Sequence, residues 1–161
     1  MTVYGFRPLM RADRAMFCAW LDSPHIGGWW QDGATEWALI AEDLDSGRCD
    51  MRIVEADGQP FAYVQDYDVR EWDMPQYADL PDGARAIDTF LGDADFVGKG
   101  HGAAYIRARA LALLDAFPML AVDPSPMNTR AIRAYGAAGF APRRTVTGEE
   151  GSPVYVMTRT H

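Results

Sequence analysis

The sequence predicts an α/β (α+β) fold, in which helices cover the faces of a central sheet. Segments typical of strands alternate with segments whose apolar residues recur at helical spacing. A hairpin signal is followed by a strand–helix–strand–helix–strand succession, which is typical of such a sheet. The chain has 161 residues, of which 48% are hydrophobic, so it is long enough to form its own core. We expect a single domain over 1–161.

Helices and strands of the first half follow from periodicity and from turn residues. Ala15, Met16, Ala19 and Trp20 recur at helical spacing, and Gly47 is a helix stop signal. The dipeptide Asp57-Gly58 between two apolar runs predicts a two-residue hairpin. The expected elements are a strand over 2–8, a helix over 9–21, a loop over 22–30, a helix over 34–46, and strands over 51–56 and 59–67.

The second half begins with a long acidic connection over 68–83 that contains two prolines. A strand, a long helix and a short strand follow it, and such a unit is a right-handed crossover candidate. Gly139 stops the next helix, and the turn at 148–151 separates two closing strands. The expected elements are strands over 84–91 and 119–122, helices over 102–117 and 128–138, and strands over 140–147 and 153–160.

Composition narrows the class of protein. The formal net charge of −8 argues against a nucleic-acid partner, because such partners require basic patches. No apolar run reaches the length of a membrane span and the N-terminus does not resemble a signal peptide, so we expect a cytoplasmic protein without a membrane partner. Cys18 and Cys49 are expected to be free thiols. The three histidines lack zinc-ligand spacing, so no metal site is expected.

The most informative motif is Val97-Gly98-Lys99-Gly100-His101-Gly102, at the start of the long helix. Glycine tolerates positive φ and allows a ligand to approach the backbone closely. The first turn of a helix presents unpaired N–H groups and a partial positive charge. The motif therefore predicts a phosphate cradle for a nucleotide-like cofactor.

This turn, with the strand before it and the helix after it, resembles the acyl-CoA-binding core of the GNAT N-acetyltransferases. Val97 departs from the family's pattern, which has glutamine or arginine there, and Lys99 could supply the charge instead. The segment from Asp123 to Phe140 resembles the second half of the family's cofactor site. The resemblance implies a central mixed, mostly antiparallel twisted sheet of about seven strands. It also implies acetyl-CoA contacts by Thr89, Phe90, Val97, Gly98, Lys99, Gly100, His101, Gly102, Ala103 and Asn128.

A narrower resemblance, over nearly the whole chain, is to the aminoglycoside 6′-N-acetyltransferases. Siderophore-biosynthesis acyltransferases, which act on hydroxylated lysine side chains, share much of the pattern. The 68–83 segment is where the chain diverges most. The resemblance rests on Trp20-Leu21, Ser23-Pro24-His25-Ile26, Trp29-Trp30, Ala62-Tyr63-Val64-Gln65-Asp66-Tyr67, Ile87-Asp88 and Val154-Tyr155.

Two residues are predicted to be catalytic. Asp88, among apolar strand residues, could bind the acceptor ammonium and accept its proton directly or through water. The alternative is a solvated or salt-bridged aspartate. The resemblance places Tyr135 beside the sulfur of coenzyme A, where a phenol can donate a proton to the departing thiolate. The alternative is a core tyrosine. Asn128 could also be the N-cap of its helix.

Six further residues are expected to line the acceptor pocket. The two tryptophans offer flat faces to a sugar ring or a cation, although one of them is expected to be structural. The resemblance makes Asp123 a second carboxylate that binds the acceptor's amines. The alternative role of Asp123 is to form a turn before Pro124. The six are Trp29, Trp30, Gln65, Tyr67, Asp123 and Glu150.

These features favour an acetyl-CoA-dependent N-acetyltransferase acting on a primary amine of a cationic small molecule, foremost the 6′-amine of an aminoglycoside. The second hypothesis is an acyltransferase acting on a hydroxylysine-type siderophore precursor. The third is a coenzyme A-binding sensor without turnover, which the presence of Asp88 and Tyr135 disfavours. A monomer or a homodimer is expected.

Overall fold

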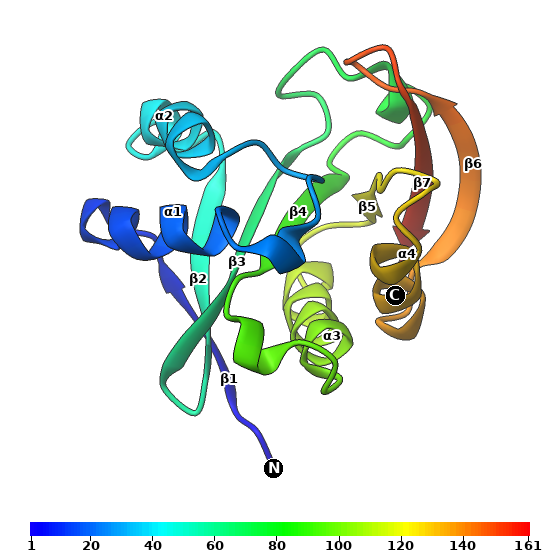
Figure 1. Ribbon diagram of the computed structural model, residues 1–161. Helices are drawn as coiled ribbons and strands as arrows, with labels where there is room; N and C mark the ends of the chain where they lie inside the picture. The colour runs from blue at the N-terminus through cyan, green and yellow to red at the C-terminus, as the bar shows by residue number, and fades with distance from the viewer. The chain divides into compact units, whose positions relative to one another are not determined.

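The computed structural model describes all 161 residues and confirms the predicted mixed α/β fold (Figure 1). Four 3₁₀ helices lie between the strands and helices: η1 (Arg11–Asp13), η2 (Pro24–Ile26), η3 (Pro75–Tyr77) and η4 (Ala94–Phe96). The main elements are β1 (Tyr4–Pro8), α1 (Arg14–Leu21), α2 (Gly33–Asp43), β2 (Asp50–Ala56), β3 (Gln59–Asp68), β4 (Arg85–Leu91), α3 (His101–Leu114), β5 (Leu120–Val122), α4 (Thr129–Ala137), β6 (Ala141–Thr147) and β7 (Pro153–Arg159).

All seven strands belong to one mostly antiparallel sheet, with the order β1-β2-β3-β4-β5-β7-β6. The parallel pair is β4 and β5, in which Arg85 lies opposite Leu120 and Ala86 opposite Ala121. Parallel neighbours cannot be joined by a tight turn, and α3 provides the connection. The strand–helix–strand unit expected from the sequence is therefore present.

Contacts divide the chain into two compact units, 1–66 with 88–101 and 67–87 with 102–161. In the first unit, α1 and α2 pack against each other (Figure 1). Its core is aromatic: Phe17 is fully buried and meets Tyr63 and Phe90 edge-on, with ring centroids 5.1 and 5.5 Å away. The prediction of a single domain over 1–161 stays a prediction.

The predicted hairpin joins β2 to β3 in the first unit. Asp57 and Gly58 both have positive φ, 49° and 85°, as a type I′ turn requires. The turn places Ala56 opposite Gln59 and so starts the register of the pair. That register determines which β3 side chains share a face.

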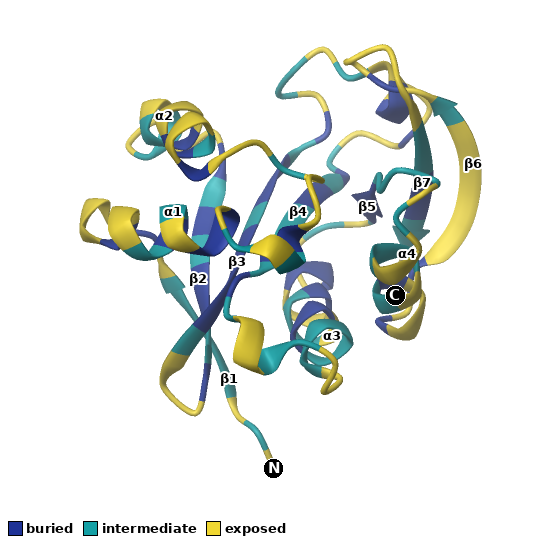
Figure 2. Ribbon diagram, viewed as in Figure 1, coloured by how far each residue is buried: buried dark blue, intermediate teal, exposed yellow.

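In the second unit, burial differs sharply between β5 and β6, which lie on either side of β7 in the sheet (Figure 2). All three residues of β5 are buried, whereas nearly every residue of β6 is exposed. The helix α4 begins at a polar cap, because Asn128 Oδ1 accepts from the backbone N–H of Ala131 at 3.2 Å. The hydrophobic core of this unit includes the fully buried Leu120 and Val156.

Three helices are clearly shorter than predicted. The helix expected over 9–21 begins only at Arg14, because Arg11–Asp13 form the 3₁₀ helix η1. The helix expected over 102–117 ends at Leu114, and Phe117 precedes Pro118, a position that disfavours helical backbone. The helix expected over 34–46 ends at Asp43, where the Ser46 hydroxyl donates to the Asp43 carbonyl at 2.9 Å.

We call residues 68–83 the 68–83 loop. Its ends are joined by a hydrogen bond from Val69 N–H to the Ala84 carbonyl, at 3.0 Å. Inside the loop, the Arg70 guanidinium donates to the Tyr77 carbonyl at 2.8 Å and to the Leu80 carbonyl. One cation therefore satisfies carbonyls in and after η3, which the sequence does not indicate.

Two expectations about individual features are answered directly. Cys18 and Cys49 are free thiols, as expected, and Cys49 is buried. None of the helices has both the length and the apolar character needed to cross a bilayer.

Candidate active site

The glycine-rich turn has the geometry expected of a phosphate cradle. Gly98 and Gly100 have φ of 76° and 82°, in the region that favours glycine. A Cβ added at either position would meet nothing within 4 Å, so the backbone is open to a ligand. The helix α3 begins at His101, and the N–H groups of its first turn have no partner within the helix. The turn therefore fits a diphosphate.

The side chains around this turn differ in charge and in the contacts that they make. Val97 supplies no polar group, whereas Lys99 is exposed and can provide positive charge. His101 Nδ1 shares a hydrogen bond with the Tyr4 hydroxyl at 2.7 Å, and its ring lies 5.1 Å from that of Phe96. This packing holds the start of α3. Gly102 and Ala103 continue the first turn and are half-buried.

Asp88 lies on β4 and contacts another predicted site residue. Gln65 Nε2 donates to Asp88 Oδ2 at 3.0 Å, and Gln65 Oε1 accepts from the Tyr63 hydroxyl at 2.7 Å. Tyr63 and Gln65 are two residues apart on β3 and so share a face of the sheet. The three side chains form a hydrogen-bonded row that ends on the Asp88 carboxylate.

The protonation state of Tyr63 determines which groups donate and which accept along this row of hydrogen bonds. Burial raises the pKa of Tyr63 well above its usual value, and nearby acidic groups, Cys49 and Asp88 among them, raise it further. The hydroxyl therefore keeps its proton at neutral pH and donates to Gln65 Oε1. With its oxygen occupied, the Gln65 amide presents its nitrogen to Asp88.

Residues next to Asp88 are anchored in the core of the first unit. The Thr89 hydroxyl donates to the Tyr63 carbonyl at 2.6 Å. The Phe90 ring is buried, and Trp30 packs on it with centroids 5.2 Å apart. Trp29 is 49% exposed. The expectation that one tryptophan of the pair is structural fits Trp30, and Trp29 is the one with a face to offer.

Tyr135 and Asn128 lie on α4 and at its start. The Tyr135 ring is buried and meets Phe140 with centroids 5.8 Å apart. Asn128 caps the helix through its Oδ1, which is the structural role weighed for it, and its amide nitrogen points away from that bond. The packing role of Tyr135 is thus present in the structure, and its catalytic role stays a prediction.

Asp123 follows β5 and contacts a residue of the 68–83 loop. Gln76, fully buried, donates from Nε2 to Asp123 Oδ2 at 3.0 Å, and the same nitrogen donates to Glu149 Oε2. The cluster thus includes Glu149, next to the predicted Glu150, which is exposed. Tyr67 is buried and meets Trp72 edge-on, with ring centroids 5.0 Å apart.

Sequence reasoning missed Tyr63, Gln76 and Glu149. Strand alternation places Tyr63 beside Gln65 and could have revealed it. Glu149 neighbours a predicted residue in the last turn. Gln76 lies in a loop without periodicity, so no local pattern marks it.

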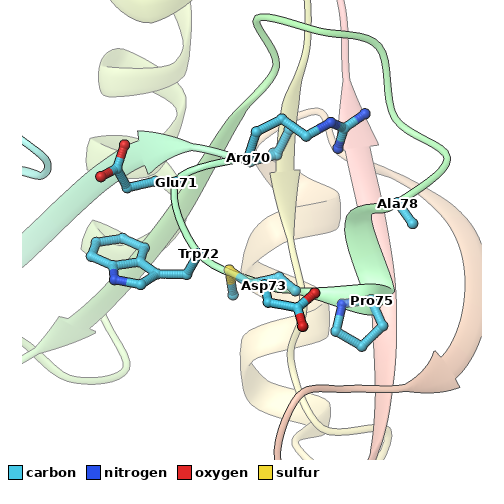
Figure 3. A pocket seen from close by; sticks show the side chains of 8 residues that line it. Arg70, Glu71, Trp72, Asp73, Pro75 and Ala78 are labelled. Carbon is cyan, nitrogen blue, oxygen red and sulfur yellow. The ribbon is translucent and has the colours of Figure 1, made fainter.

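The 68–83 loop also encloses a shallow cavity of about 470 Å³. Figure 3 shows Glu71 and Trp72 pointing to one side of the loop and the Arg70 guanidinium to the other. The whole lining comes from this segment: Val69, Arg70, Glu71, Trp72, Asp73, Met74, Pro75 and Ala78.

Comparison with known proteins gives consistent matches. The family model of the acetyltransferase (GNAT) domain matches residues 10–147. The chain is 32% identical to the aminoglycoside N(6′)-acetyltransferase type 1 of Klebsiella pneumoniae, over 94% of this chain and 80% of that protein.

Two solved structures of AAC(6′)-Ib are similar over nearly the full chain. The complex with coenzyme A and kanamycin has a TM-score of 0.84 and 31% identity, covering 99% of this chain and 95% of that one. The complex with paromomycin and acetyl-CoA has a TM-score of 0.84 and 30% identity, covering 98% and 93%.

Proposed function

We propose a function for this chain from one premise: it belongs to the GNAT acetyltransferase family, whose model matches residues 10–147. The reaction is transfer of an acetyl group from acetyl-CoA to the 6′-amine of an aminoglycoside. The observation that carries this proposal is the similarity, over nearly the whole chain, to aminoglycoside 6′-N-acetyltransferases. The acceptor is a small cationic molecule, which suits a chain of net charge −8.

The glycine-rich turn supports binding of acetyl-CoA. Backbone N–H groups at Gly98, Gly100 and the first turn of α3 would hold the diphosphate, with Lys99 adding charge. When bound, acetyl-CoA supplies the electrophilic thioester carbon. Asn128 and the backbone at Thr89 and Phe90 complete the proposed set of cofactor contacts.

Asp88 handles the acceptor amine in this proposal. An alkylammonium must lose a proton before its nitrogen has a lone pair to attack with. The Asp88 carboxylate binds the ammonium and accepts that proton, directly or through water. Gln65 donates to one carboxylate oxygen, so it fixes the orientation of the acid. Trp29, Trp30, Tyr67 and Glu150 are proposed to border the acceptor.

Tyr135 is the proposed general acid. It can donate its phenolic proton to the departing sulfur, so that the thiol leaves uncharged. Asp123 is proposed to bind a second ammonium of the acceptor. Holding the amine and the thioester together supplies a large part of the rate enhancement in such reactions.

A thiol-release assay with an amine panel tests the reaction. With acetyl-CoA present, kanamycin should release thiol and N⁶-hydroxylysine should not. Release with hydroxylysine alone would reassign the acceptor to the siderophore class, and acetyl-CoA binding without release would indicate a sensor. The variant Asp88→Asn should lower kcat at least about 10²-fold, with acetyl-CoA affinity by calorimetry unchanged. Full activity in this variant would remove Asp88 from its role.

A further inference from the structure

Gln76 is unusual among the residues of the 68–83 loop. It is fully buried, yet its side chain is polar and its Nε2 contacts two carboxylates, those of Asp123 and Glu149. Ionised carboxylates only accept hydrogen bonds, so the amide nitrogen must face them. A primary amide has two N–H donors, one for each carboxylate. Gln76 is therefore matched to holding Asp123 and Glu149 as a pair.

The other end of the same amide is not satisfied. Gln76 Oε1 is buried and has no hydrogen-bond partner. A buried acceptor without a partner carries a desolvation penalty, which methionine, of similar shape, would avoid. This cost offsets stability that the two hydrogen bonds to carboxylates contribute, so stability is a weak reason for an amide at this position. Local costs of this kind concentrate where function requires them.

The position of Gln76 is set by two polar anchors of its loop. Arg70 braces the inside of the loop through backbone carbonyls, one of them that of Tyr77. On the outside, Asp79 pairs with Arg143 and Arg144 of β6, at 3.1 and 3.0 Å. Because both anchors hold the loop, the Gln76 side chain keeps a fixed position relative to the carboxylates that it contacts.

We propose that Gln76 is a positioning residue for the acceptor: it holds Asp123 and Glu149 together as a pair that binds ammonium groups other than the reacting amine. This inference rests on the proposed function. A neutral amide between two carboxylates stabilises both charges by hydrogen bonding without cancelling them. The hydrogen bond from Gln76 uses only one of the acceptor positions of each carboxylate. The pair thus favours acceptors with several amines over acceptors with one.

The test compares two acceptors in the full-length protein and in Gln76→Met. Kanamycin carries several amines, and 6-amino-6-deoxyglucose carries only the reacting one. In the variant, KM for kanamycin should rise about tenfold, while kcat and KM for acetyl-CoA stay within twofold of wild type. For the monoamine, kcat/KM should also stay within about twofold. The melting temperature should change little, because removing the buried unpaired oxygen offsets the loss of two hydrogen bonds to carboxylates.

The control variant is Asp82→Asn, which changes an almost fully exposed carboxylate of the same loop. Asp82 lies 3.5 Å from Arg70 Nε, but an ion pair so exposed contributes little, so every parameter should stay unchanged. If Gln76→Met does not fold, Glu149→Gln replaces it, because Glu149 is exposed and its substitution should not disturb folding. This variant should also raise KM for kanamycin and leave kcat/KM for the monoamine unchanged. An unchanged KM for kanamycin, or an equal loss with both acceptors, would overturn the proposal.

The same experiment separates this inference from the proposed function. Normal kanamycin acetylation by wild type, with unchanged kinetics in the variant, refutes the role of Gln76 alone. If wild type binds kanamycin without acetylating it, the proposed function fails, and the calorimetric Kd replaces KM in judging Gln76. If wild type neither acetylates nor binds kanamycin, both proposals fail.

Discussion

Replacing Tyr63 by phenylalanine removes one hydroxyl from the row that ends on Asp88. The lost bond, 2.7 Å long, is made by a fully buried side chain, and its loss leaves Gln65 Oε1 without that donor. Such a loss costs about 1–2 kcal/mol. For a chain of this size, that lowers the melting temperature by about 3–6 °C.

Tyr63→Phe is expected to lower activity because the Tyr63 hydroxyl orients the Gln65 amide, which in turn donates to Asp88. Without the hydroxyl, the Gln65 amide can rotate, and Asp88 no longer faces a fixed donor. We expect kcat/KM for kanamycin to fall about tenfold, a cost of about 1.4 kcal/mol, with KM for acetyl-CoA unchanged. Steady-state thiol release, with each substrate varied in turn, measures both parameters.

A double-mutant cycle decides whether Tyr63 acts through Gln65. If it does, adding Tyr63→Phe to Gln65→Met should cost no further activity, because the amide that Tyr63 orients is already gone. Fully additive losses, or a rise in KM for acetyl-CoA, would refute this reasoning.

Three further outcomes are expected. Gly100→Val forces a β-branched residue to φ of 82° and should raise KM for acetyl-CoA about tenfold with little change in kcat; an unchanged KM removes the turn from the cofactor site. Tyr135→Phe should lower kcat about 10²-fold, and a raised KM with kcat intact would contradict the acid role. A hydrogen bond from Arg7 lowers the pKa of Asp13; the Met10 N–H contributes in the same direction, and burial opposes it. The ionised carboxylate therefore stabilises the fold at pH values above its unfolded pKa, near 3.8. This stability is lost as the pH falls through the folded pKa. Asp13→Asn should thus lower the melting temperature by about 3–6 °C at pH 7; thermal denaturation at several pH values should show this difference shrinking in acid, and a pH-independent difference would argue against the ion pair.

Elements with local signals were predictable from the sequence. Asp57-Gly58 marks its hairpin because only a few residues adopt positive φ at both turn positions. The positive φ values of Gly98 and Gly100 before α3 were predictable for the same reason. Helix ends were less predictable, because α2 ends at a hydrogen bond from Ser46 that no periodicity encodes.

Contacts between distant segments were not predictable in the same way. Gln76 and Asp123 are brought together by the 68–83 loop. Its conformation depends on the Arg70 guanidinium, which binds backbone carbonyls, and on ion pairs between Asp79 and two arginines of β6. Neither propensity nor spacing specifies such a loop. Asp88 could be singled out as a polar residue in an apolar strand, but its contact with Gln65 required the pairing of strands.

The central claim is that this chain moves an acetyl group from acetyl-CoA to the 6′-nitrogen of an aminoglycoside. The most direct measurement is NMR of the purified product after incubation with kanamycin and acetyl-CoA, combined with a count of the thiol released. We predict one acetyl group, on the 6′-nitrogen, and one thiol for each acetyl transferred. Acetylation at another amine, or thiol release with unmodified kanamycin, would contradict the account.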